Sequence, residues 1–141
     1  MKFDDKKSEK IAQHLLRMQF EMGGRGEDRK IDCYGVLKYF YAQFDIHLPD
    51  YSYRDDWNEK EELYLREYAS FFRKLGADEP PEIGDMILFI NTAEAANHAA
   101  LYLGKGRFIH AYRNIGTKID LLTHKFWKQK IHGFFRIKDA H

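Results

Sequence analysis

The sequence predicts an α+β domain in which helices come first and an antiparallel sheet follows. Apolar residues recur at helical spacing through the first half of the chain, and short β-type runs begin at Met86. The pair Pro80-Pro81 interrupts regular structure between the two halves. Because helices and strands are segregated along the chain, the pattern is typical of an α+β domain and disfavours a parallel βαβ repeat.

Composition is that of a single globular domain, and we treat residues 1–141 as one unit. With 141 residues, 44% of them hydrophobic, the chain is long enough to bury a sizeable core. Its 23 basic and 22 acidic residues nearly cancel and form no long block of like charge, so neither nucleic acid nor a membrane is indicated as a partner. One cysteine rules out an internal disulfide or a CxxC zinc or redox pair.

The N-terminal segment from Met1 to Lys7 is charged and lacks the apolar core and cleavage site of an export signal. No apolar run reaches the length of a transmembrane helix. We therefore expect the protein to be cytoplasmic as synthesised. Action in a virion, the periplasm or the cell wall would require another component to deliver it.

Helical periodicity predicts three long helices before the strands. The first, over 8–22, places Ile11, Leu15, Met18 and Met22 on one face. The second begins at Cys33 and is followed by a break near Pro49. The third is expected over 58–75, with Gly76 as its C′ residue. An aromatic and apolar stripe runs along it: Tyr64, Tyr68, Phe71 and Leu75.

The second half of the chain predicts an antiparallel sheet. Gly104-Lys105-Gly106 is a hairpin turn, which makes the strands before and after it antiparallel neighbours. A short helix carrying Phe126 and Trp127 should precede the closing strand. The expected strands are 86–90, 98–103, 107–111, 115–121 and 131–138.

Cys33 is the strongest candidate for chemistry. Asp32 is a good helix N-cap, so the thiol should sit in the first turn of a helix with a buried apolar face. The positive end of the helix dipole favours the thiolate, which is the reactive form. The alternative is that a lone cysteine is a small buried apolar side chain.

Two histidines complete a possible site. His98 begins one hairpin strand and His110 ends the other, so both imidazoles should lie at the same end of the sheet. Thiol catalysis needs a base and a group that orients the base. We interpret Cys33 as nucleophile, His98 as general base and later acid, and His110 as the orienting residue. A metal site made from the same three side chains lacks a fourth ligand at zinc-like spacing, so no metal or other cofactor is expected.

These segments resemble the NlpC/P60 cysteine peptidases over nearly all of residues 23–138. The matching motifs are Asp32-Cys33-Tyr34-Gly35-Val36-Leu37, Gly84-Asp85-Met86-Ile87-Leu88-Phe89, His98-Ala99-Ala100-Leu101-Tyr102-Leu103-Gly104 and Phe108-Ile109-His110-Ala111. The cysteine-helix segment, with Tyr34 and then Leu48-Pro49-Asp50-Tyr51, is most similar to phage-encoded and tail-associated members.

The resemblance implies a papain-like fold and a Cys33-His98-His110 triad. It also implies hydrolysis of peptidoglycan stem peptides, usually between D-glutamate and a diamino acid. Asp32 matches a residue that contributes to substrate contacts in the family, and we expect Tyr34 and Gly24 to border the substrate as well.

Three departures from the family pattern concern the substrate rather than the triad. Tyr34 stands where members commonly have serine, and Met22 precedes Gly23-Gly24 where many have an aromatic residue. Phe20 lacks the hydroxyl of the tyrosine that usually helps to fix the free amine of the stem peptide.

Three other functions stay open. The triad would equally serve an amidase or transferase acting on an amide outside the cell wall. A non-catalytic structural module of a phage tail could have the same fold. A self-associating protein could use the aromatic stripe as its interface. A phage tail or an immunity protein is therefore a candidate partner, beside the stem peptide.

Overall fold

The computed structural model describes residues 3–49, 71–90 and 96–138, and it confirms the α+β fold class. The helices are α1 (Asp5–Leu15), the 3-10 turn η1 (Glu27–Arg29), α2 (Cys33–Ala42) and α4 (Lys125–Lys128). The strands are β1 (Gln19–Phe20), β2 (Lys30–Ile31), β3 (Phe72–Lys74), β4 (Met86–Ile90), β5 (Ala96–Gly104), β6 (Arg107–Tyr112), β7 (Gly116–Leu121) and β8 (Ile131–Ile137). None of the helices in these ranges has the length and apolar character needed to cross a bilayer.

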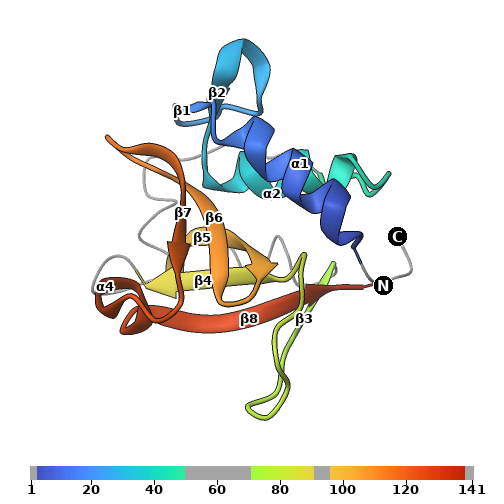
Figure 1. Ribbon diagram of the computed structural model, residues 1–141, viewed down its shortest axis with the longest axis vertical. Coiled ribbons are helices and arrows are strands. Elements are labelled where there is room, and N and C mark those ends of the chain that lie inside the picture. Colours follow the sequence, from blue (N-terminus) through green and yellow to red (C-terminus); the bar gives the residue numbers. More distant parts are fainter. Residues whose placement is uncertain (1–2, 50–70, 91–95, 139–141) are drawn as a thin grey trace.

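A six-stranded sheet in the order β3-β8-β4-β5-β6-β7 forms the centre of the fold, and all of its pairs are antiparallel. The expected hairpin joins β5 to β6, and Gly104 and Gly106 at its turn have φ values of +88° and +75°. Figure 1 shows α1 and α2 together on one side of the sheet and α4 at its far end, between β7 and β8. The first two α-helices of the chain, α1 and α2, therefore form one layer on that side of the sheet.

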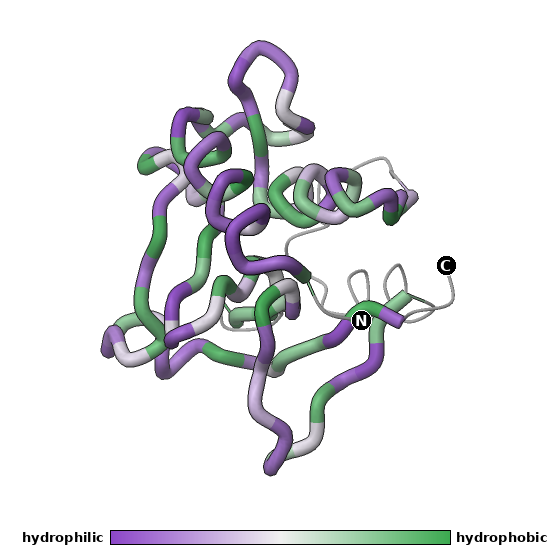
Figure 2. Tube along the Cα trace, turned by 45° about the vertical axis from the view of Figure 1, so that its right-hand side comes forward, coloured by the Kyte–Doolittle hydropathy of each residue, from purple (hydrophilic) through white to green (hydrophobic). Residues whose placement is uncertain are grey.

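Each face of the sheet carries its own apolar cluster. One cluster fills the space between the sheet and the helix layer, where α2 packs against β5 and β6. The other lies on the opposite face and includes Phe89, Phe108 and Trp127 of α4. In Figure 2, hydrophilic colours dominate α1, whereas hydrophobic green recurs along α2. The more apolar α2 is also the more buried of the two helices, and it packs against β5 and β6.

The first helix is shorter than the sequence predicted. Helix α1 ends at Leu15, and the chain then turns so that the expected continuation of the helix forms β1. Strand β1 pairs in parallel with β2, a contact between distant segments that local periodicity does not reveal. Met18 is nevertheless buried, whereas Met22 is among the exposed apolar side chains.

The prediction for the third helix was wrong at its C-terminal end. Residues 58–70 lie outside the described ranges, as do the stripe residues Tyr64 and Tyr68. Phe72–Lys74 form strand β3, which pairs with β8 at the sheet edge. Gly76 therefore follows a strand and is not the C′ residue of a helix. Pairing with β8 decides the conformation of this segment, because tertiary contacts override a weak helical pattern.

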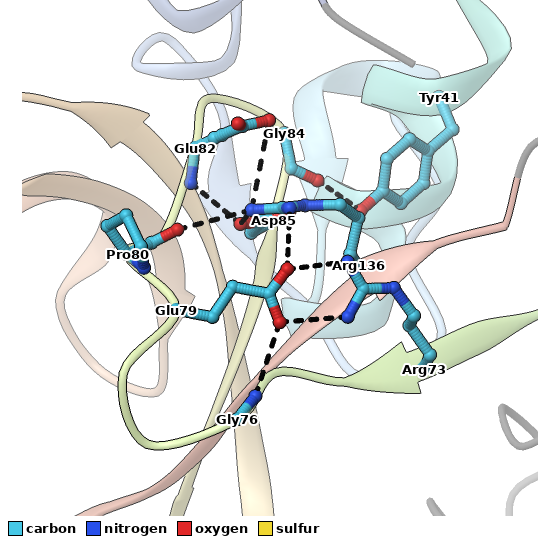
Figure 3. A network of polar contacts seen from close by, with 9 residues as sticks. All are labelled: Tyr41, Arg73, Gly76, Glu79, Pro80, Glu82, Gly84, Asp85 and Arg136. Atoms are coloured by element: carbon cyan, nitrogen blue, oxygen red, sulfur yellow. Dashed lines mark hydrogen bonds and ion pairs between the residues drawn. The ribbon is translucent and has the colours of Figure 1, made fainter.

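A polar network fixes the end of the sheet where β4 begins (Figure 3). Arg136 on β8 donates to both carboxylate oxygens of Asp85, at 3.0 Å and 2.8 Å, and Asp85 is only 2% exposed. The hydroxyl of Tyr41 on α2 donates to the carbonyl of Gly84 at 2.6 Å. Burial and the nearby Asp85 charge raise the pKa of Tyr41 well above its ordinary value, so the hydroxyl stays a donor. The network thereby ties α2 to the sheet.

Replacing Arg136 with alanine should lower the free energy of unfolding by roughly 3 kcal/mol, because the Asp85 carboxylate would stay buried without its charge partner. Arg73→Ala is the matched control: Arg73 pairs with Glu79 in the same network, but its side chain is 49% exposed, and we expect little change. Urea unfolding measures both. Equal losses in the two variants would show that the buried carboxylate is not what Arg136 stabilises.

Candidate active site

Cys33 is the first residue of α2 and is 4% exposed. The Asp32 side chain caps the helix by accepting a hydrogen bond from the backbone N–H of Gly35 at 2.7 Å. The carbonyl of Asp32 accepts the first helical hydrogen bond from Val36 at 3.0 Å. The position in the first turn is therefore the one that the sequence predicted, and it places the thiol in the field of the helix dipole.

Two glycines allow the glycine-rich loop to pass very close to this helix start. A Cβ on Gly35 would lie 2.3 Å from the carbonyl oxygen of Gly24, and a Cβ on Gly24 would lie 2.7 Å from backbone atoms of Lys30 and Ile31. Real side-chain carbons do not come this close to backbone atoms. Gly35 thus allows the loop to pack against α2, and Gly24 is required for the loop to pass β2, whatever its relation to a substrate.

The other two residues expected to border the substrate are also engaged within the protein. The Asp32 carboxylate accepts from the backbone N–H of Gly23 at 2.8 Å and from Nη1 of Arg25 at 2.9 Å, in addition to its capping bond. Tyr34 is 1% exposed; its hydroxyl donates to the carbonyl of Pro49, and the guanidinium of Arg25 lies 5.1 Å from the centre of its ring. A substrate role for Asp32, Tyr34 and Gly24 stays a prediction.

His98 and His110 lie at the same end of the sheet, as the hairpin topology predicted, and their rings are in contact. Nε2 of His98 on β5 is 2.7 Å from Nδ1 of His110 on β6, and both side chains are buried. This contact occupies Nε2 of His98, so Nδ1 is the nitrogen that remains for exchange of a proton with another group. The arrangement is that of a base held in place by a second ring.

Asp120 on β7 extends this pair, and sequence reasoning missed it. Its Oδ2 lies 2.8 Å from Nε2 of His110. In the register of β6 and β7, Lys118 is directly opposite His110, so Asp120 is the diagonal neighbour on the same face. The signal in the sequence was a lone carboxylate in the strand after His110, which only the strand register connects to the imidazole.

An aromatic enclosure surrounds the two imidazoles. The ring of Trp127 on α4 stacks on His98, with centroids 5.5 Å apart, and meets His110 edge-on at 4.8 Å. Tyr112 and Phe89 also contact the ring of His98, at 5.4 Å and 5.8 Å. These side chains exclude water from the imidazoles, which strengthens hydrogen bonds and disfavours unpaired charge.

The enclosure determines how these groups ionise. Burial lowers the pKa of His98 well below its ordinary 6.5, and the proximity of His110 lowers it further. Burial also lowers the pKa of His110, although the hydrogen bond and charge of Asp120 act in the opposite direction. The hydrogen bond from His110 holds the pKa of Asp120 below its ordinary 3.8. Both rings are therefore neutral at pH 7, and the carboxylate is ionised.

The strand segments that carry the imidazoles also reach the cluster that contains the thiol. Ala99 and Ala111, which follow the two histidines, belong with Cys33 to the apolar cluster beneath α2. Because side chains alternate along a strand, the imidazoles themselves project from the opposite pleat. A contact between the sulfur and Nδ1 of His98 stays a prediction.

Within the described ranges, no group of three or more His, Cys, Asp or Glu side chains is arranged to hold a metal ion. Both nitrogens of His110 already take part in hydrogen bonds, to His98 and to Asp120. The contacts that the structure describes at this place therefore join two imidazoles and a carboxylate.

Comparison with known proteins identifies the family of this chain. The chain is 29% identical over 127 residues to the gamma-DL-glutamyl hydrolase of Bacillus subtilis, covering 89% of this chain and 27% of that protein. It is 31% identical over 127 residues to the tail tip assembly protein K of Escherichia phage lambda, covering 87% and 59%. The chain thus spans less than two thirds of the length of both relatives.

A solved structure supports the same fold. An NLP/P60-family protein similar to a lipoprotein, from Staphylococcus aureus, superposes with a TM-score of 0.69 at 23% identity over 97% of this chain and 43% of that one. The family model described as NlpC/P60 matches residues 17–136. This chain belongs to the NlpC/P60 family.

Proposed function

We propose that this chain is a cysteine peptidase domain that hydrolyses an amide bond in peptidoglycan stem peptides. Cys33 serves as nucleophile, His98 as general base and then acid, and His110 as the residue that orients His98. The observation that carries the proposal is the 2.7 Å contact between the two buried imidazoles, on strands against which the cysteine helix packs. Membership of the NlpC/P60 family supports the same assignment.

The chemistry is acyl transfer in two steps. In the first, Nδ1 of His98 takes the thiol proton, the sulfur attacks the amide carbonyl, and His98 returns the proton to the departing amine. In the second, His98 takes a proton from water, the hydroxide attacks the thioester and the C–S bond breaks. The stem-peptide carboxylate is released, and His98 returns its proton to the sulfur. The backbone N–H of Cys33 is the proposed donor to the oxyanion, a kind of interaction worth roughly 3 kcal/mol where it has been measured.

The neutral state of His98 suits this role. A base must be unprotonated to accept the thiol proton, and burial keeps the pKa of His98 well below 6.5. Once protonated, the ring can donate from Nε2 to Nδ1 of His110, and Asp120 lies beyond at 2.8 Å to balance the charge. The enclosure by Trp127 keeps water from competing for these hydrogen bonds.

We propose the bond between D-glutamate and a diamino acid as the site of cleavage. The name of the Bacillus subtilis relative, a gamma-DL-glutamyl hydrolase, supports a glutamyl substrate. Asp32 is proposed to influence substrate binding through the loop that it anchors, because three donors already contact its carboxylate. Substrate that bound Asp32 directly would have to displace one of these donors.

A structural role in a phage tail is the second candidate. The similarity to the tail tip assembly protein K of phage lambda favours a phage setting, and that setting is compatible with either a hydrolase or a non-catalytic module. An amidase or transferase acting on another amide would use the same side chains. Digestion of defined muropeptides separates these functions, because only the stem-peptide peptidase should produce a new free amine on the diamino acid.

Cys33→Ala should abolish hydrolysis of defined muropeptides while leaving the fold intact, because alanine replaces a buried thiol without adding volume. Mass spectrometry of the digest measures cleavage, and circular dichroism with urea unfolding checks the fold. Ser8→Ala is a control for loss of a buried polar group on α1, and it should retain activity. Hydrolysis by Cys33→Ala at the wild-type rate would exclude the thiol as nucleophile.

Both imidazoles should titrate below pH 6.5 in Cys33→Ser, with His98 the lower, because burial disfavours the charged rings. Unfolded histidines bind protons at higher pH than these folded ones. The free energy of unfolding should therefore be constant above about pH 6.5 and fall as the pH drops through the range between the unfolded and folded pKa values. Proton NMR titration of the ring resonances checks this, and midpoints at or above 6.5 would contradict it.

A further inference from the structure

Three side chains from three adjacent strands form a continuous chain of hydrogen bonds. Oδ2 of Asp120 on β7 is 2.8 Å from Nε2 of His110 on β6, and Nδ1 of His110 is 2.7 Å from Nε2 of His98 on β5. The side chain of Asp120 is 11% exposed, so the carboxylate lies at the outer end of a buried row. From this position the carboxylate can determine which nitrogen donates and which accepts in each hydrogen bond of the row.

We propose that Asp120 is a positioning residue that fixes the tautomers of both histidines and so keeps the lone pair of His98 on Nδ1, the nitrogen that takes the thiol proton in the proposed mechanism. An ionised carboxylate only accepts hydrogen bonds, so Nε2 of His110 must carry a proton. In a neutral ring Nδ1 then carries a lone pair and accepts the proton of Nε2 of His98. His98 is left with its lone pair on Nδ1. The inference deepens the proposed function, on which the role of His98 as base rests.

The opposite tautomers would make a poorer base. Were Asp120 absent, His110 would be able to carry its proton on Nδ1 and donate to Nε2 of His98. His98 would then hold its own proton on Nδ1, where it has no lone pair to accept the thiol proton. Asp120 therefore acts through two rings, and its removal should reduce the population of competent enzyme rather than weaken substrate binding.

Charged groups around Asp120 support its ionised state. Nζ of Lys118 is 3.4 Å from Oδ1, and the hydrogen bond from His110 lies on the other oxygen. Both lower the pKa of the carboxyl group, with the His110 bond the larger cause. Lys118 is 45% exposed, so solvent screens its contribution. The decisive contact is the one with His110.

The first test needs no variant and no activity. Nitrogen-15 NMR of the wild-type imidazoles at pH 7 should show the proton on Nε2 of both His98 and His110. A proton on Nδ1 of His110 would overturn the proposal. Should the expected tautomers be present in a protein that hydrolyses no muropeptide, the proposed function fails and the proton arrangement stands.

The second test compares three variants in the muropeptide assay. Asp120→Asn keeps the shape but removes the charge. It should lower kcat by about 10- to 100-fold with little change in KM, the usual cost of losing a hydrogen-bond partner that acts through another residue. The same variant should lose the preference for Nε2–H in His110. An unchanged kcat or an unchanged tautomer would each overturn the proposal.

Two controls isolate the role of the carboxylate. Lys118→Gln removes the other charged partner of Asp120, and Asp45→Asn removes the charge from the exposed contact of 3.1 Å between Asp45 and His47. Both should retain kcat within about twofold of the wild type. A loss in Lys118→Gln as large as that in Asp120→Asn would contradict a role exerted through His110. If Asp120→Asn fails to fold, the wild-type tautomers decide the question.

Discussion

The hydrogen bond between Nε2 of His98 and Nδ1 of His110 is the contact on which the candidate site depends. At 2.7 Å, it requires β5 and β6 to be antiparallel neighbours whose side chains face the same way at both positions. It also requires a dry environment, which Trp127 and the other aromatic side chains provide. A sheet with a shifted register would separate the two rings, and the chain of hydrogen bonds from Asp120 to His98 would be broken.

The rest of the fold holds this contact in place from a distance. The network of Arg136 and Asp85 lies at the start of β4, whereas Phe89, near the other end of that strand, pairs with His98. Tyr41 connects the network to α2 through the carbonyl of Gly84. The helix that carries Cys33 is thus fixed to the sheet at the end opposite the imidazoles, and its own start is fixed by Asp32 and the glycine loop.

Local chemistry made several features predictable from the sequence. The N-cap at Asp32 and the hairpin turn at Gly104-Lys105-Gly106 depend on neighbouring residues, and both occur in the structure. The hairpin alone was sufficient to predict that His98 and His110 lie at the same end of the sheet. The predicted strands in the second half also occur, because their apolar runs are separated by clear turn residues.

What escaped prediction depends on contacts between distant segments. Strand β3 exists because Phe72–Lys74 pair with β8, and α1 stops early because the following residues pair with β2. Asp120 was missed for a related reason: its closeness to His110 depends on the register of β6 and β7, which the sequence pattern did not specify. The engagement of Asp32 by Arg25 likewise depends on how the glycine loop folds back on the helix.

The most direct measurement is the pH dependence of Cys33 alkylation by iodoacetamide, in the wild type and in His98→Ala. If His98 is the base that takes the thiol proton, alkylation of the wild type should reach its half-maximal rate at a lower pH than alkylation of the variant. Superimposable rate profiles would contradict the pairing of Cys33 with His98, and the hydrogen-bonded histidines would then have no connection with the thiol.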